Sequence, residues 1–290
     1  MIRSACSNGR FALSLKGRLA DTSPMPQKLV GFSWERGAIA NGKSHFDFLR
    51  VDDCFEGVRC GVPGDYAGWH NDNLSYTDFQ AFNCKIAYVL YRERAMGHHI
   101  ENSRLAGCSK YFDIYAGGAV YVEAAKILSA CTLLYFRNTP KGVTPGIGQA
   151  NGYYRFNNVK ADSQTGSDLM YLDMERGYQI KAIFDGGIIA ANTYAADNKL
   201  LINAVGNTTV TLRDIVNLQG KTIKLTAAEK DNVWLRPHCT VESCVVGAGV
   251  SGDLKNLKND TSKGPYYMKA IGCSDGWENK ALPDYFEEWK

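Results

Sequence analysis

A short pattern recurs between residues 46 and 137: an apolar residue, an apolar or small residue three positions later, and then a cysteine. It begins at Phe48, Phe79, Ile100 and Val122, and it returns without a cysteine at Phe156. Successive starts are therefore 21 to 34 residues apart. A loose period of this size is typical of a stacked solenoid, in which each repeat is one supersecondary unit.

The cysteines themselves indicate how the repeats stack. Cys54, Cys84, Cys108 and Cys131 occupy similar points in four successive repeats. Free cysteine packs like a small hydrophobic residue, so we expect these four side chains to form one buried column. Nine cysteines in 290 residues are too sparse for a disulfide scaffold. The nearest pairs lack the C-x-x-C spacing and the histidine pair of a zinc site, so no metal is predicted.

Alternation of apolar and polar residues predicts strands in both halves of the chain. The segment HFDFLRV places Phe46 and Phe48 on one face, and IKAIF places Ile180, Ala182 and Phe184 on one face. Turn-forming pairs such as DGG and KDN separate these segments. The stretch AAKILSACTLL has helical propensity, but its place in the repeat favours strand. The fold class predicted is all-β.

Unequal loop lengths favour a parallel β-helix, because a solenoid tolerates long insertions at one bend. The alternative is a β-sandwich, which would space its turns evenly at 8 to 12 residues. The boundaries predicted are an N-terminal lead-in segment over 1–30, a β-helix over 31–250, and a loop-rich C-terminal cap or oligomer contact over 251–290.

Composition excludes several classes of function. The net charge is +3, from 33 basic and 30 acidic residues, which makes no case for nucleic acid or for an anionic membrane. A small basic cluster is predicted to be a solvated face: Lys85, Arg92, Arg94, Arg104 and Lys110. The sequence shows no secretory signal and no apolar run long enough to insert in a membrane, so we expect synthesis in the cytoplasm of the cell that makes it. No nucleotide-binding or zinc-protease motif occurs, and no cofactor is predicted.

Three segments carry a family resemblance: FQAFNCKIAYVL, HHIENSRLAGC and FNNVKADSQTG. They resemble coils of right-handed parallel β-helix proteins, a group that includes bacteriophage tailspikes, tail fibres and pectate-lyase-like enzymes. The resemblance covers roughly residues 31–250. It implies a phage tail fibre or tailspike subunit in the virion, a homotrimer that binds host cell-surface polysaccharide alongside other phage tail proteins. Two alternatives stay open on the same scaffold: a polysaccharide depolymerase, either hydrolase or lyase, and a purely structural virion subunit.

The segment VDDCFEG supplies the catalytic candidates Asp52, Asp53 and Glu56. Glycoside hydrolysis requires two carboxyl groups, one as acid and one as base or nucleophile. The letters DDC resemble a motif of polygalacturonase-type β-helix hydrolases. We take Asp52 or Asp53 as the general acid, with Glu56 or Asp78 as its partner. The competing interpretation is that the two aspartates are solvated or bend-forming residues.

Two loop regions supply the substrate-binding candidates, which are Trp69, His70, Tyr91, Arg92, His98 and His99. Aromatic and planar polar side chains suit sugar rings, which offer an apolar face for stacking and hydroxyls for hydrogen bonds. The same residue types are favoured where one subunit contacts another, so an intersubunit contact is the alternative.

Overall fold

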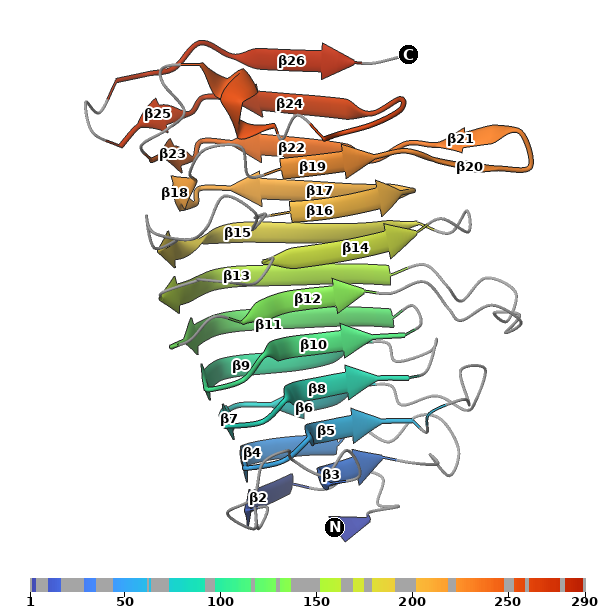
Figure 1. Ribbon diagram of the computed structural model, residues 1–290. Coiled ribbons are helices and arrows are strands. Elements are labelled where there is room, and N and C mark those ends of the chain that lie inside the picture. Colours follow the sequence, from blue (N-terminus) through green and yellow to red (C-terminus); the bar gives the residue numbers. More distant parts are fainter. Residues whose placement is uncertain are drawn as a thin grey trace.

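The computed structural model describes a chain of stacked β-strands (Figure 1). The residues that it describes are 2–3, 10–16, 29–34, 44–61, 63, 73–91, 97–115, 118–128, 131–136, 152–162, 169–174, 179–190, 202–218, 223–247, 253–258, 261–276 and 280–288. Within these ranges the chain is all-β, apart from one short 3-10 helix, η1 (Leu254–Leu257). No helix in this part of the chain is long and apolar enough to cross a membrane.

Two long sheets contain almost every strand. In spatial order, the nine-stranded sheet contains β1 (Ile2–Arg3), β3 (Val30–Trp34), β5 (Glu56–Cys60), β8 (Ile86–Leu90), β10 (Lys110–Ile114), β12 (Thr132–Phe136), β14 (Met170–Met174), β16 (Ile202–Gly206) and β19 (Ile223–Thr226). The main path of the 15-stranded sheet contains β2 (Arg10–Lys16), β4 (Ser44–Asp52), β6 (Leu74–Tyr76), β9 (His98–Ala106), β11 (Gly118–Ile127), β13 (Gly152–Asp162), β15 (Ile180–Ala190), β17 (Thr208–Arg213), β22 (His238–Glu242), β24 (Tyr267–Ile271) and β26 (Tyr285–Glu288).

The shorter strands extend the large sheet or leave it. β7 (Phe79–Phe82), β18 (Val216–Leu218), β23 (Val245–Val246) and β25 (Ser274–Asp275) lie beside the main path of the 15-stranded sheet. β20 (Ala228–Lys230) and β21 (Val233–Leu235) form an antiparallel hairpin that projects from the stack (Figure 1).

Successive strands alternate between the two sheets along the chain. As far as β19, the chain passes from the large sheet to the small sheet and back, as β9 is followed by β10 and β11 by β12, whereas β22 to β26 all belong to the large sheet. We call one such passage a layer. Adjacent layers pair in parallel, and the exception within the two large sheets is the antiparallel pair of β24 with β26. This parallel pairing differs from the antiparallel sheets of a β-sandwich.

In-register pairing stacks equivalent side chains, and one inward position shows this through seven layers. Its members pair in sequence along the large sheet, and all are buried: Ile100, Val122, Phe156, Phe184, Leu212, Val241 and Ala270. The predicted inward face of IKAIF is confirmed, because Ile180, Ala182 and Phe184 are all fully buried. The strand interpretation of AAKILSACTLL is confirmed for its two ends, which lie in β11 and β12, while residues 129–130 lie outside the described residues.

Bends recur at one register position of the large sheet, where the backbone has a positive φ. This bend column contains Asn102, Ala124, Asn158, Gly186, Asp214, Ser243 and Gly272, with φ values between 48° and 68°. Glycine, asparagine and aspartate reach this left-handed region at low cost, which accounts for most of the residue types found there. The bend lies inside β9, β11, β13 and β15, and in the next three layers it separates β17 from β18, β22 from β23 and β24 from β25.

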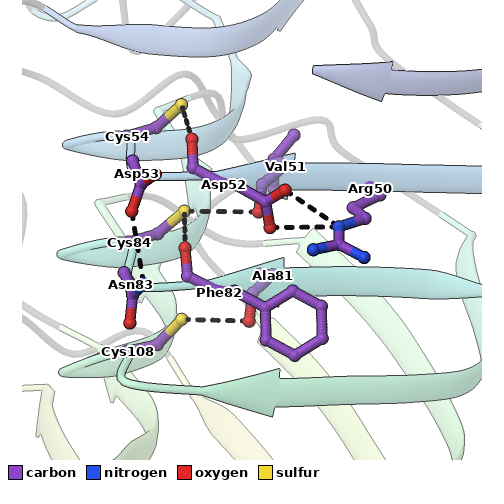
Figure 2. Close-up of polar contacts among 10 residues, drawn as sticks. All are labelled: Arg50, Val51, Asp52, Asp53, Cys54, Ala81, Phe82, Asn83, Cys84 and Cys108. Atoms are coloured by element: carbon purple, nitrogen blue, oxygen red, sulfur yellow. Dashed lines mark hydrogen bonds and ion pairs between the residues drawn. The ribbon is translucent and has the colours of Figure 1, made fainter. Parts of the chain in front are cut away.

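The predicted cysteine column is present over three layers. Cys54, Cys84 and Cys108 lie one above another at the corner between the two sheets (Figure 2). The Cys84 thiol donates to the Val51 carbonyl oxygen of the neighbouring layer at 3.7 Å. The Cys108 thiol repeats this contact with the carbonyl oxygen of Ala81 at 3.5 Å.

Cys131 departs from that column by one position. Lys110 pairs with Thr132, so Cys131 lies opposite Ser109 and not opposite Cys108. Its thiol is buried, and its sulfur contacts the carbonyl oxygen of Thr132 at 3.7 Å. The expectation of one column of four cysteines was therefore wrong at its fourth member.

Strands outside 31–250 join the same sheets. β1 pairs with β3, β2 pairs with β4, and β24 continues the large sheet beyond β22. At the C-terminal end, β26 lies antiparallel on β24. Strand pairing thus continues across both predicted boundaries, and the domain boundaries themselves stay a prediction.

A substitution in the corner tests the bend geometry. Gly107 has φ +69°, and an added Cβ would lie 2.5 Å from Oδ1 of Asn83. Gly107→Ala should lower the free energy of unfolding by about 1–3 kcal/mol, because the left-handed strain adds to this overlap. Ala124 has φ 54° without being glycine. Ala124→Gly should leave the free energy of unfolding within about 0.5 kcal/mol or raise it. Urea unfolding of both variants measures the difference in the free energy of unfolding. Equal losses of stability in the two variants would contradict the close contact assigned between Gly107 and Asn83.

The C-terminal strand carries a second test. Glu287 accepts hydrogen bonds from Tyr285, from Lys258 at 3.1 Å and from Tyr266 at 2.8 Å. Burial opposes the charge of Glu287, but these hydrogen bonds outweigh it and lower the pKa of the carboxyl group. Its stabilising contribution is therefore present above the unfolded pKa and is lost as pH falls through the folded pKa.

Glu287→Gln should lower the melting temperature at pH 6, and the difference from the unmodified protein should shrink towards pH 3. Glu288 is an exposed neighbour on the same strand, so Glu288→Gln serves as the matched control. Melting curves at both pH values measure the effect. A loss that is the same at pH 3 and pH 6 would contradict the assigned role of the charge.

Candidate functional site

The three predicted catalytic residues lie at one corner between the sheets. Asp52 is the last residue of β4 and Glu56 is the first residue of β5. Asp53 lies in the connection between them, with φ 55°. Figure 2 shows how this corner repeats in the layers of Asn83 and Cys108.

Asp52 is held by an arginine on its own strand. Nε of Arg50 lies 2.8 Å from one carboxylate oxygen of Asp52 and 3.2 Å from the other (Figure 2). The guanidinium of Arg50 also lies over the ring of Phe82, 4.8 Å from its centroid. Arg104 approaches the same ring at 5.9 Å. Both oxygens of Asp52 are therefore engaged by a fixed cation.

Asp53 forms the bend, as the competing interpretation of DDC expected. Its left-handed backbone turns the chain so that Cys54 points into the core. Nδ2 of Asn83, at the equivalent position of the next layer, donates to Oδ1 of Asp53 at 3.2 Å. Gly107 takes this position in the following layer. The letters DDC thus describe a recurrent turn in which Asp, Asn or Gly precedes cysteine.

Glu56 is buried although it is charged. Nε of Arg59 donates to Oε2 of Glu56, and the Tyr91 hydroxyl donates to Oε1 at 2.9 Å. Burial, followed by the charge of Glu56, raises the pKa of the Tyr91 hydroxyl. The Tyr91 ring stacks on Tyr115 with 4.5 Å between centroids. Of the predicted catalytic and binding residues, the structure brings Glu56 and Tyr91 into contact.

Asp78, the alternative catalytic partner, has a local partner instead. Nε2 of Gln80 lies 3.2 Å and 3.3 Å from its two carboxylate oxygens. Among the described residues, Asp78 forms no hydrogen bond or ion pair with Asp52, Asp53 or Glu56.

Two of the three predicted histidines, His98 and His99, point in opposite directions. His98 has no exposed surface, and its Nδ1 lies 3.0 Å from the Tyr88 hydroxyl inside the core. It is therefore a core residue and does not reach a ligand on the outer surface. His99 is exposed and stacks on Tyr121 with 4.7 Å between ring centroids. Trp69, His70 and Arg92 lie outside the described residues.

A second charged pair repeats the Glu56–Arg59 arrangement two layers away. Nζ of Lys110 lies 2.9 Å from a carboxylate oxygen of Asp113, which has no exposed surface. Register places Lys110 in line with Glu56 and Asp113 in line with Arg59, so the signs are reversed. The sequence signal is a pair of opposite charges three residues apart, which a search for catalytic motifs does not single out.

The aromatic residues on this face also form ladders. Nζ of Lys110 lies 3.6 Å from the ring centroid of Tyr135. Tyr135 in turn stacks on Tyr171, with centroids 4.8 Å apart and planes inclined by 16°. The Tyr135 ring is thus contacted both by the ammonium group of Lys110 and by the ring of Tyr171.

Buried thiols show no sign of a reactive centre. A hydrogen bond with Cys108, together with burial, raises the pKa of the Cys84 thiol to about 12. Burial raises the pKa of Cys239 to about 12 as well. Such thiols stay protonated at neutral pH, whereas nucleophilic cysteines need a lowered pKa. In the described ranges, no group of three or more His, Cys, Asp or Glu side chains is placed to hold a metal ion.

Comparison with known proteins gives no relative. No family model, no curated protein and no solved structure matches this chain. Its function therefore has to be inferred from its sequence, its fold and the contacts of its side chains.

The Glu56 cluster gives a stability prediction. Glu56→Gln removes the charge that balances the largely buried Arg59, so the free energy of unfolding should fall by about 2 kcal/mol. Tyr91→Phe removes one hydrogen bond and should cost about 1 kcal/mol. Glu101 is exposed, so Glu101→Gln should change stability by less than about 0.5 kcal/mol. Chemical unfolding of the three variants tests the order; a Glu56→Gln loss as small as that of Glu101→Gln would overturn it.

Proposed function

We propose that this protein is a right-handed parallel β-helix and a bacteriophage tail fibre or tailspike subunit that binds host cell-surface polysaccharide without cleaving it. We further propose that it acts as a homotrimer in the virion, alongside other tail proteins. The resemblance of its repeats to such proteins motivates the viral assignment. The arrangement of carboxylates at the β4–β5 corner favours binding over cleavage.

Parallel layers support the β-helix part of the proposal. Strands alternate between two sheets, adjacent layers pair in register, and bends recur at matched positions in seven layers. Stacking of equivalent positions is what a solenoid requires. A long outer surface built from repeated layers suits a repeating linear polymer, because equivalent groups recur along both.

The proposal of binding without cleavage depends on one observation, which is that the carboxylate oxygens of Asp52 and Glu56 already accept hydrogen bonds from protein groups. A glycosidase acid must present a proton to the leaving oxygen while a second carboxylate acts as base or nucleophile. Both oxygens of Asp52 face Nε of Arg50, and those of Glu56 accept from Tyr91 and Arg59. Neither Asp52 nor Glu56 has an oxygen free of a protein donor, so a catalytic role for this pair is disfavoured.

Encapsulated and capsule-free cells of one strain test the function directly. The labelled protein should adsorb to encapsulated cells and not to capsule-free cells. Purified capsule incubated with the protein should release neither reducing ends nor unsaturated sugars. Glu56→Gln should leave adsorption unchanged where it remains folded. Light scattering should give the mass of three chains.

Each alternative has its own signature in this experiment. Release of sugar ends that Asp52→Asn or Glu56→Gln abolishes would establish a depolymerase and overturn the binding proposal. Absence of adsorption across a panel of capsule types would support a purely structural subunit. A stable single-chain mass would contradict the homotrimer.

A further inference from the structure

We infer that the polysaccharide bound by this protein is acidic, and that it lies along a column of basic residues on the outer face of the large sheet. This inference rests on the proposed function and names its ligand class. The basic column consists of the cations Arg50, Arg104, Lys126 and Lys160. The neutral Gln80 takes the same register position between Arg50 and Arg104, so the column runs through five successive layers.

Register places these side chains in line. Arg50 pairs with Gln80, Gln80 with Arg104, Arg104 with Lys126, and Lys126 with Lys160. Arg104, Lys126 and Lys160 are exposed, while Arg50 and Gln80 are half-buried. Strands in a sheet lie about 4.8 Å apart, so the column is roughly 19 Å long. Asp52 balances the charge of Arg50, and the other cations on this line give a linear field, suited to a polymer with regularly spaced anions.

The first part of the basic column is held in place by packing. The guanidinium groups of Arg50 and Arg104 both contact the ring of Phe82, which comes from the layer between them. Asp52 fixes Arg50 further, through Nε. Cation–π contacts leave the outer edge of a guanidinium able to bind a carboxylate, and less side-chain entropy is lost when it does so.

The middle of the basic column has cations without balancing acids. In the part of the chain that the structure describes, neither Arg104 nor Lys126 forms an ion pair. The acids nearest in sequence, Glu101 and Glu123, belong to another register position across the bend column. Glu123 accepts a hydrogen bond from Asn157. An anionic polymer would therefore be attracted to one side of the bend and repelled from the other.

Beyond Lys160 the same register position becomes apolar. Ile188 and Val216 follow in the next two layers, each with 42% of its surface exposed. A sugar ring combines charged substituents with an apolar face, so a surface that is first cationic and then apolar suits an acidic polysaccharide. Single-stranded nucleic acid would call for aromatic faces open to bases. Phe82 does not offer one, since guanidinium groups approach its ring.

A charge reversal in the centre of the basic column tests the inference. Lys126→Glu places an acid between Arg104 and Lys160, where it gains favourable neighbours, so the fold should be retained. The matched control is Lys181→Glu, since Lys181 is an exposed lysine on β15 at a different outward register position. Both variants are measured against polygalacturonate, neutral dextran and polyphosphate at low and moderate salt, with melting curves to check folding.

Polygalacturonate should bind the unmodified protein, more weakly as salt rises, and dextran should not. Lys126→Glu should weaken binding about tenfold while Lys181→Glu stays within about twofold. Equal effects of the two reversals would overturn the basic column as the site. Polyphosphate binding as tightly as polygalacturonate would overturn the assignment of a sugar ligand.

Failure of the inference is distinguishable from failure of the proposed function. If the protein adsorbs to encapsulated cells but does not bind polygalacturonate, or if Lys126→Glu adsorbs as well as the unmodified protein, the acidic ligand is wrong and polysaccharide binding stands. If the protein adsorbs to no capsule and binds no polysaccharide, the proposed function is wrong, and the inference falls with it.

Discussion

In-register parallel pairing between layers is the interaction on which the rest of the structure depends. Backbone hydrogen bonds hold each layer at a fixed offset from the next, so whatever occupies a position in one layer meets its equivalent in the next. Inside, this stacks apolar residues such as Phe156 on Phe184. At the corner it stacks Cys54, Cys84 and Cys108. On the outer surface, it aligns charged residues that lie far apart in the sequence.

The same constraint explains what could be predicted from the sequence. Alternation and the recurrence of cysteine depend on residue type, so strands such as β15 and the three-layer cysteine column were predictable. The place of Cys131 was not, because it depends on a one-residue offset set by the pairing of Lys110 with Thr132. The sequence motif also could not distinguish a catalytic pair from a turn at Asp52 and Asp53, because the distinction depends on the left-handed backbone of Asp53.

Which residues of different layers lie side by side was the feature of the candidate site that was hardest to predict from the sequence. Arg104 was included in a basic cluster by nearness in sequence, together with residues such as Lys85 and Lys110. The structure instead aligns it with Lys126 and Lys160, which lie 22 and 56 residues further along the chain. Unequal loops make that alignment invisible until the register is known. The Glu56–Tyr91 contact is hidden for the same reason, because it spans 35 residues.

Stacking along the layers also decides which forces are left for recognising a ligand. His99 lies on Tyr121, Tyr91 on Tyr115, and Tyr135 on Tyr171. Each of these rings uses one face for its neighbour, and Tyr91 is buried as well, so fewer ring faces are left for stacking on a sugar. The apolar stacking that sugar-binding sites usually draw on is then reduced. Charge attraction is not reduced in this way, because cations aligned by the register reinforce one another's field along the line. On the proposed function, a linear ligand would therefore be held chiefly by the aligned cations.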